Sequence, residues 1–154
     1  MTAIEFGLLA IPFFAIILAT LETSYVFLAS QILDSAVNDT TRAIRTGVAQ
    51  SANVDAEGYR GLICDRLFGL FDCDELKIKV STVANFTSAN TPPPVDSTGA
   101  WTITEGYAAG AGSDVILAEV YYKWPILMSF ASFNLANVGD GTRLMASVRL
   151  FKNE

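Results

Sequence analysis

The chain has 154 residues, of which 51% are hydrophobic, a net charge of −6 and no histidine. This length allows one small domain and a helix but not two domains. The negative charge argues against nucleic acid as a partner, because such binding rests on Lys and Arg side chains that neutralise phosphates. The missing histidine removes the commonest general base. We identify no catalytic, cofactor-binding or metal site in the sequence.

A long apolar stretch with two acids opens the chain. Residues 6–21 carry no charge and lie between Glu5 and Glu22, and residues 23–33 are again uncharged. As an α-helix the first block is about 24 Å long, somewhat short of a ~30 Å hydrocarbon core. A helix that crosses a bilayer here therefore brings a carboxylate to the edge of the lipid. No Lys or Arg precedes the stretch, so the basic end of a secretory signal is missing.

Glu5 is an acid that a plain membrane anchor would not tolerate. A carboxylate in lipid costs on the order of 2.5–3.5 kcal/mol unless it is paired, and the helix dipole returns only up to about 1 kcal/mol. A second copy of the chain, offset along the helix axis, would bring the α-amino group of its Met1 to Glu5 as a charge-assisted hydrogen-bond donor. We therefore predict that Met1 and Glu5 take part in subunit assembly.

The helix is expected to continue beyond the membrane to Thr46, with Gly47 as its stop. Over this part mostly apolar residues recur every three or four positions and mark one stripe, which comprises Val26, Ala29, Leu33, Val37, Thr40, Ile44 and Val48. The first half should lie in lipid or among neighbouring helices, and the second half should be a spine for a small domain. Pro12 removes one backbone hydrogen bond and should kink or locally melt the helix.

The remaining residues predict a head of mixed structure. We expect a helical region over residues 1–50 and an extracytoplasmic head domain over residues 51–154. Asp55 is a candidate N-cap for a short helix that runs to about Phe68. The fold class is α+β, a long N-terminal α-helical spine with a small antiparallel β-sheet of three or four strands.

The strands are predicted from alternation and from β-branched and aromatic residues. They are expected at residues 76–83, 101–103, 115–124 and 143–152. Two segments between them are expected to be loops, namely residues 87–99 with three prolines and the glycine-rich residues 106–112.

Cys64 and Cys73 are too widely spaced for a CxxC redox motif, and no further Cys or His completes a zinc site. A disulfide in an oxidising compartment is the best interpretation, and a pair of reduced, buried thiols is the alternative. Nearby, Asp72, Asp74 and Glu75 offer carboxylates to a hard cation. A solvated turn is the preferred interpretation of these acids, because no EF-hand spacing or glycine hinge accompanies them.

Residues 125–140 form a long connection between two predicted strands, with apolar side chains at Ile126, Leu127, Met128, Phe130 and Phe133. Such a run on a head domain is either a contact surface for another subunit or protein, or a part of the core. The sequence leaves both interpretations open.

Several of these features together resemble the TadE-like pilins of the tight-adherence (Tad) system, in the type IV pilin superfamily. The resemblance rests on Ala3-Ile4-Glu5-Phe6-Gly7-Leu8 with Pro12 and Glu22, on residues 31–42, on the cysteine pair, on Tyr122-Lys123-Trp124-Pro125 and on residues 151–154. It implies that a prepilin peptidase cleaves after a glycine, so that Met1 is the processed terminus. The alternative is that Met1 is an initiator. It also implies that Phe6, Pro12 and Glu22 join Met1 and Glu5 in subunit assembly.

The sequence thus predicts a non-enzymatic, structural pilin-like subunit. It would reside in the inner membrane as a single-pass protein with its head outside the cytoplasm, and then pack its N-terminal helix into an extracellular pilus or a periplasmic pseudopilus. The resemblance implies a role in surface adhesion, with other copies of the chain or related pilins, a prepilin peptidase and the pilus assembly machinery as partners. The alternative is a single-pass membrane-anchored periplasmic domain that binds a ligand or serves an envelope complex.

Overall fold

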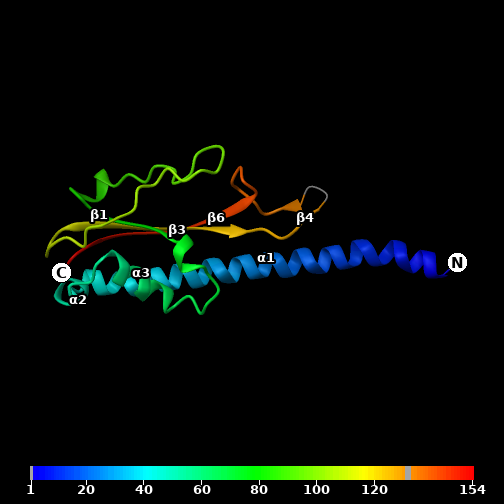
Figure 1. The fold of residues 1–154 in the computed structure, drawn as a ribbon, viewed down its shortest axis with the longest axis horizontal. Helices are drawn as coiled ribbons and strands as arrows, with labels where there is room; N and C mark the ends of the chain where they lie inside the picture. Colours follow the sequence, from blue (N-terminus) through cyan, green and yellow to red (C-terminus); the bar gives the residue numbers. More distant parts are fainter. Residues whose placement is uncertain (1, 131–132) are drawn as a thin grey trace.

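The computed structural model describes residues 2–130 and 133–154, and Figure 1 shows a long helix with a sheet packed along its second half. The helix α1 (Thr2–Arg45) has 44 residues and is about 66 Å long. The predicted α+β fold with a helical spine is confirmed. The helix is continuous through Pro12, so the expected local melting at this residue is wrong.

Two shorter helices follow the spine. The helix α2 (Val48–Ser51) begins after Gly47, whose φ of 73° lies in the left-handed region that glycine adopts without strain. The helix α3 (Ala56–Cys64) begins at Asp55, whose Oδ1 accepts the Gly58 amide at 2.8 Å, as a Ser/Asp-type cap does. The predicted extension of α3 to about Phe68 is wrong, because the chain turns after Cys64 and Phe68 itself has a φ of 53°.

Four strands form the main sheet in the order β2-β1-β3-β6, and these are β1 (Lys77–Val83), β2 (Gly106–Tyr107), β3 (Val115–Pro125) and β6 (Thr142–Lys152). Both β1 and β6 pair antiparallel with β3. However, β2 pairs parallel with β1, so the sheet is mixed and not wholly antiparallel as predicted. The two residues of β2 lie in the segment that was expected to be a loop, and so short an edge strand needs no β-branched run.

Smaller elements fill the connections. They are the 3₁₀ helices η1 (Cys73–Glu75) and η2 (Phe86–Ser88), and the hairpin strands β4 (Ser129–Phe130) and β5 (Phe133–Asn134). The strand expected at residues 101–103 is wrong, because Trp101 forms an isolated bridge with Val95 around a tight turn. The Asp96 carboxylate organises this turn by accepting the amides of Thr98 and Ala100.

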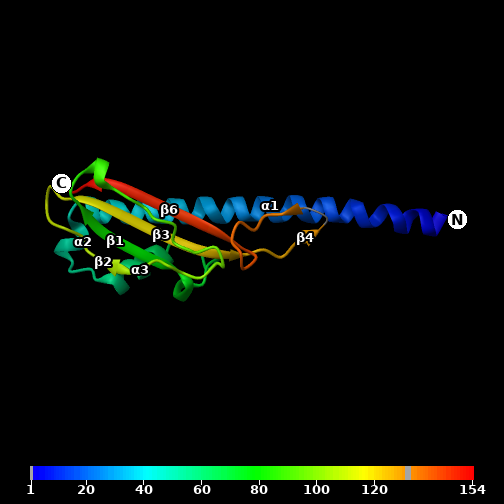
Figure 2. The ribbon, with the colours of Figure 1, turned by 90° about the horizontal axis from the view of Figure 1, so that it is seen from above.

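The core lies between the second half of α1 and one face of the sheet, and the view in Figure 2 shows the strands crossing above this half of the helix. Six of the seven predicted stripe residues are buried there: Val26, Ala29, Leu33, Val37, Thr40 and Ile44. The seventh, Val48, is exposed, because the break at Gly47 turns Ala49 inward in its place. The sheet contributes the alternate residues of β1 and β3, among them Ile78, Val80 and Val120.

Candidate assembly helix and the arm beside it

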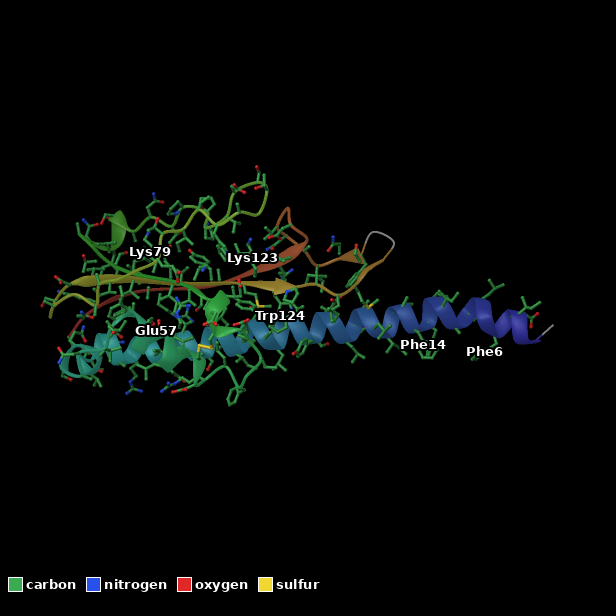
Figure 3. The ribbon with its side chains drawn as sticks, in the orientation of Figure 1. Phe6, Phe14, Glu57, Lys79, Lys123 and Trp124 are labelled. Carbon is green, nitrogen blue, oxygen red and sulfur yellow. A yellow bond between two sulfur atoms is a disulfide. The ribbon has the colours of Figure 1, made fainter. Side chains whose placement is uncertain are left out.

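The N-terminal half of α1 carries a continuous apolar surface that the rest of the chain leaves uncovered. Large side chains from Ile4 to Leu21 are exposed around the helix, with Ile4 and Phe6 both at 72%. This helix is long and apolar enough to cross a membrane, and its most apolar 18-residue stretch has no buried residue. Figure 3 shows Phe6 and Phe14 on the part of the helix that extends beyond the head.

Three hydroxyl side chains on this surface are satisfied within the helix. The hydroxyls of Thr20, Thr23 and Ser24 each donate to the carbonyl oxygen four residues earlier, at 2.8 Å. This back-bonding leaves no hydroxyl proton in need of water, which is the condition for placing such residues in lipid. The apolar half can therefore enter a membrane or a bundle of helices despite its three hydroxyls.

The structure separates the predicted assembly residues into two groups. Glu5, Phe6 and Pro12 lie on the exposed half of α1, with Glu5 in its first turn. Met1 lies outside the described residues. Glu22 is 17 residues from Glu5, which is about 26 Å along a helix, and it faces the head.

Glu22 connects the spine to residues 126–139, which we call the arm. Its Oε1 accepts the amide of Leu127 at 2.6 Å and that of Met128 at 3.0 Å. Its Oε2 is buried and has no hydrogen-bond partner among the described residues. Beside this contact lies an apolar groove of about 560 Å³ between helix and arm, lined among others by Leu18, Leu21 and Trp124. The Glu22 carboxylate therefore fastens the arm to the membrane-facing end of the spine.

The base of the arm is closed by an ion pair. Lys123 Nζ lies 2.8 Å from Asp140 Oδ2, donates to the carbonyl of Gly99, and lies 4.9 Å above the ring of Trp101. The hydrogen bond from Lys123, with further bonds from Thr142, lowers the pKa of Asp140 to about 2. The two ends of the arm are thereby held together by a charge pair.

Further polar contacts fix the second half of α1 to the sheet, and sequence reasoning did not identify them. Asp34 accepts hydrogen bonds from Ser147 at 2.8 Å and from Arg149 at 2.6 Å, both on β6. Near the helix end, Arg45 pairs with Glu154 at 3.0 Å. These partners are more than a hundred positions apart in the sequence, so no local pattern points to them.

The head holds α3 with a disulfide and a charge network. Cys64 at the end of α3 is bonded to Cys73 in η1. Arg60 of α3 pairs with Glu105 at 2.8 Å, and its guanidinium also donates to the carbonyls of Cys73 and Leu76. Burial opposes ionisation of Glu105, but hydrogen bonds from the Ile78 amide and from Arg60 outweigh it and lower its pKa.

One acid of the cluster beside the disulfide, Asp72, forms a local helix cap. The Asp72 side chain accepts the amide of Asp74 at 3.1 Å and so begins η1. Among the residues that the structure describes, no group of three or more His, Cys, Asp or Glu side chains is placed to hold a metal ion.

Comparison with known proteins locates the resemblance in the spine. The sequence model of the TadE-like protein family matches residues 1–42. We call residues 1–42 the TadE-like segment. No match was found among curated proteins or among solved structures. The TadE-like segment includes Glu5, Phe6, Pro12 and Glu22, and it ends at Arg42, inside the half of α1 that packs on the head.

The TadE-like segment overlaps the helix that is long and apolar enough to cross a membrane. Its first half supplies the uncovered apolar surface, and its second half supplies the buried stripe. The TadE-like match thus falls on the stretch whose length and apolar character suit a membrane span.

Proposed function

We propose that this chain is a structural pilin-like subunit that assembles through its N-terminal helix into a Tad pilus or pseudopilus. The observation that carries the proposal is the uncovered apolar half of α1 with an acid in its first turn. Such a surface must be covered by lipid before assembly and by neighbouring helices after it. The TadE-like match supports a structural role for the chain and not an enzymatic one.

Glu5 gives this assembly its register. The carboxylate is exposed beside Phe6 on an otherwise apolar surface, so it is costly in lipid unless a cation meets it. An N-terminal amine of a neighbouring copy, offset by a few residues along the axis, satisfies that need. Burial of apolar side chains would then supply the affinity between neighbouring helices. The charge pair would select one axial shift between them over the others.

The topology of the proposed subunit follows from the same helix. It waits in the inner membrane as a single-pass protein with its head outside the cytoplasm, where the Cys64–Cys73 disulfide is stable. The division into a helical region of residues 1–50 and a head of residues 51–154 stays a prediction, and the shared core shows that the second half of α1 is integral to the head. A prepilin peptidase and the pilus assembly machinery are the proposed partners.

The decisive experiment compares Glu5→Ala with Glu75→Ala in cells that make pili. Glu75 is an exposed acid in η1 and is the matched control for loss of one carboxylate. We expect Glu5→Ala to abolish incorporation into sheared filaments while the protein stays in the membrane fraction, and Glu75→Ala to assemble normally.

The alternative function makes a different prediction in the same experiment. A single-pass anchor that carries a periplasmic binding or interaction domain has no need of an acid in its first turn. Normal function of Glu5→Ala, together with failure to find the chain in filaments, would therefore overturn the subunit proposal. Amino-terminal sequencing of the filament-associated protein determines whether the chain is cleaved ahead of Met1.

A further inference from the structure

The arm has a composition unlike the rest of the head. Residues 126–139 contain no charged side chain, although the chain as a whole has a net charge of −6. The nearest charged residues on the two sides are Lys123, three positions before the arm, and Asp140, directly after it. These two residues pair at the base of the arm. An ion pair therefore lies at the base of a segment that has no charge of its own. The lack of charge suits a segment that leaves water, because charged side chains are costly in lipid.

The arm also lies beside the apolar half of the spine. Glu22 holds the amides of Leu127 and Met128, and the adjoining groove is lined by Leu18 and Leu21. Figures 1 and 2 agree that β4 lies further toward the N-terminus of α1 than the end of β3 does. The arm thus extends from the head along the part of the helix that is apolar all round.

When the apolar half of α1 spans a bilayer, the arm lies level with one face of that bilayer. From Ile4 to Leu21 the helix spans about 26 Å, close to the thickness of a hydrocarbon core of about 30 Å. Glu22 then stands at the outer boundary, and the edge-to-face pair of Tyr25 and Trp124 lies just beyond it. Tyr and Trp concentrate at this level of membrane proteins because their rings have an apolar body and a polar atom.

The described part of the arm is suited to lipid. Leu127 is 85% exposed, and no large apolar side chain among the described residues is more exposed. The backbone is paired within the hairpin, with Ser129 opposite Asn134, and the Asn134 side chain accepts the amide of Ala136. An exposed apolar side chain whose own backbone amide is already hydrogen-bonded is what the interfacial region of a bilayer accommodates.

We propose that the described residues of the arm, 126–130 and 133–139, form a second membrane contact, with Leu127 inserted into the leaflet that faces the head. The partner is the uncharged part of the lipid, the glycerol and upper acyl region, because the arm has no cation for an anionic headgroup. The contact fixes the rotation of the head about the spine before assembly. This inference rests on the proposed function, in which the subunit is anchored in a membrane before assembly. The experiment below distinguishes a failure of the arm contact from a failure of the membrane anchoring.

The test places an environment-sensitive fluorophore on single cysteines in the full chain, reconstituted in phosphatidylcholine vesicles. Leu127→Cys is the test position, and Phe68→Cys is the matched control, since Phe68 is 80% exposed but lies beside Ile32 and Ala36, further from the membrane. Phe14→Cys on the apolar half is the reference for insertion. Both native cysteines are in the disulfide, so the unmodified chain should take up no label.

Lipids brominated at defined depths provide the quencher. We expect the Leu127 label to be quenched several-fold more strongly than the Phe68 label, most by bromines near the glycerol, with no dependence on salt or on added anionic lipid. An unquenched Leu127 label beside a quenched Phe14 label overturns the arm contact and leaves the proposed function intact. If the Phe14 label is also unquenched, the proposed anchoring of the helix in a membrane is wrong. A Leu127 signal that rises with protein density but ignores brominated lipid means contact with a second copy and also overturns the inference.

Discussion

The two halves of α1 are equally helical and both rich in apolar residues, yet they meet opposite surroundings. In the first half Leu9 is 70% exposed, whereas in the second half Leu33 is 1% exposed and Ile44 is fully buried. The difference lies in how the apolar residues are spaced. The first half is apolar on every side, and the second half is apolar on one stripe with polar residues on the opposite face.

This comparison teaches that periodicity, not apolar content, indicates what covers a helix. A stripe repeated every three or four residues can be satisfied by one sheet of the same chain, as here by β1, β3 and β6. An apolar surface without a polar side cannot be covered by one small head and needs lipid or several other helices. The part of α1 that is apolar all round meets the striped part near Glu22, where the arm contacts the helix.

The largest expected effect tests whether the two halves differ energetically. Leu33→Ala should lower the free energy of unfolding of the head by about 2–5 kcal/mol, because it removes buried methyl groups from a packed core. Leu9→Ala deletes the same atoms from the exposed half and should leave the stability of the head unchanged. Urea unfolding in micelles, followed by the fluorescence of Trp101 and Trp124, measures both. Equal destabilisation by the two variants would contradict the comparison.

The disulfide should contribute the next largest effect, confined to the packed half. Replacing both Cys64 and Cys73 with serine should cost about 2–3 kcal/mol of stability on the chain-entropy account of a short closed loop. Reduction of the unmodified chain should give the same shift. Since α3 rests on the second half of α1, membrane insertion of the first half should not change. The prediction fails if reduction leaves the urea midpoint where it was.

Glu22 lies at the boundary between the halves and should have a smaller, local effect. Glu22→Ala removes the acceptor of two amides and should loosen the arm by about 1–2 kcal/mol, given that the amides of Leu127 and Met128 can then bond to water. Glu22→Gln keeps one acceptor oxygen and should retain most of the contact. Amide hydrogen exchange at these two positions is the direct readout. Unchanged protection in Glu22→Ala would show that the arm is held by its apolar contacts alone.

Residues with a local pattern were predictable, and those whose partners are distant were not. The stripe from Val26 to Ile44, the cap at Asp55 and the alternation in β1 each produce a signal within a few positions, and each is found in the structure. The interpretation of the arm stayed open because its apolar residues follow neither a helical nor a strand period. Leu127 is now seen to be exposed, whereas Ile126 and Leu135 are partly buried against the core.

The contacts of Glu22 and Asp34 illustrate what a sequence cannot encode locally. Glu22 accepts hydrogen bonds from backbone amides. Nearly every residue has such an amide, so the residue types in the sequence do not indicate the partner. Asp34 follows the buried Leu33 and pairs with Arg149, which is 115 positions away. The parallel pairing of β2 was missed for a similar reason, because two residues are too short for any period.

The smallest effect concerns the base of the arm and depends on pH. The bonds from Lys123 and Thr142 hold the pKa of Asp140 at about 2, below the ordinary value of 3.8. A lowered pKa in the folded state means that the stabilisation is present above about pH 4 and is lost as the pH falls toward 2. The carboxyl carbon shift of Asp140 in an NMR titration should therefore move near pH 2.

Lys123→Met is the control for that titration, since it removes the first cause of the shift and keeps a similar chain length. The pKa of Asp140 should then rise toward its ordinary value, and the charge pair that closes the arm should be absent at every pH. The first half of α1 has no part in this ion pair, so insertion reported from Phe14 should be the same in both variants. If Asp140 titrates near pH 4 in the unmodified chain, the base is not closed by this pair. Glu22 would then remain as the polar contact that holds the arm to the spine.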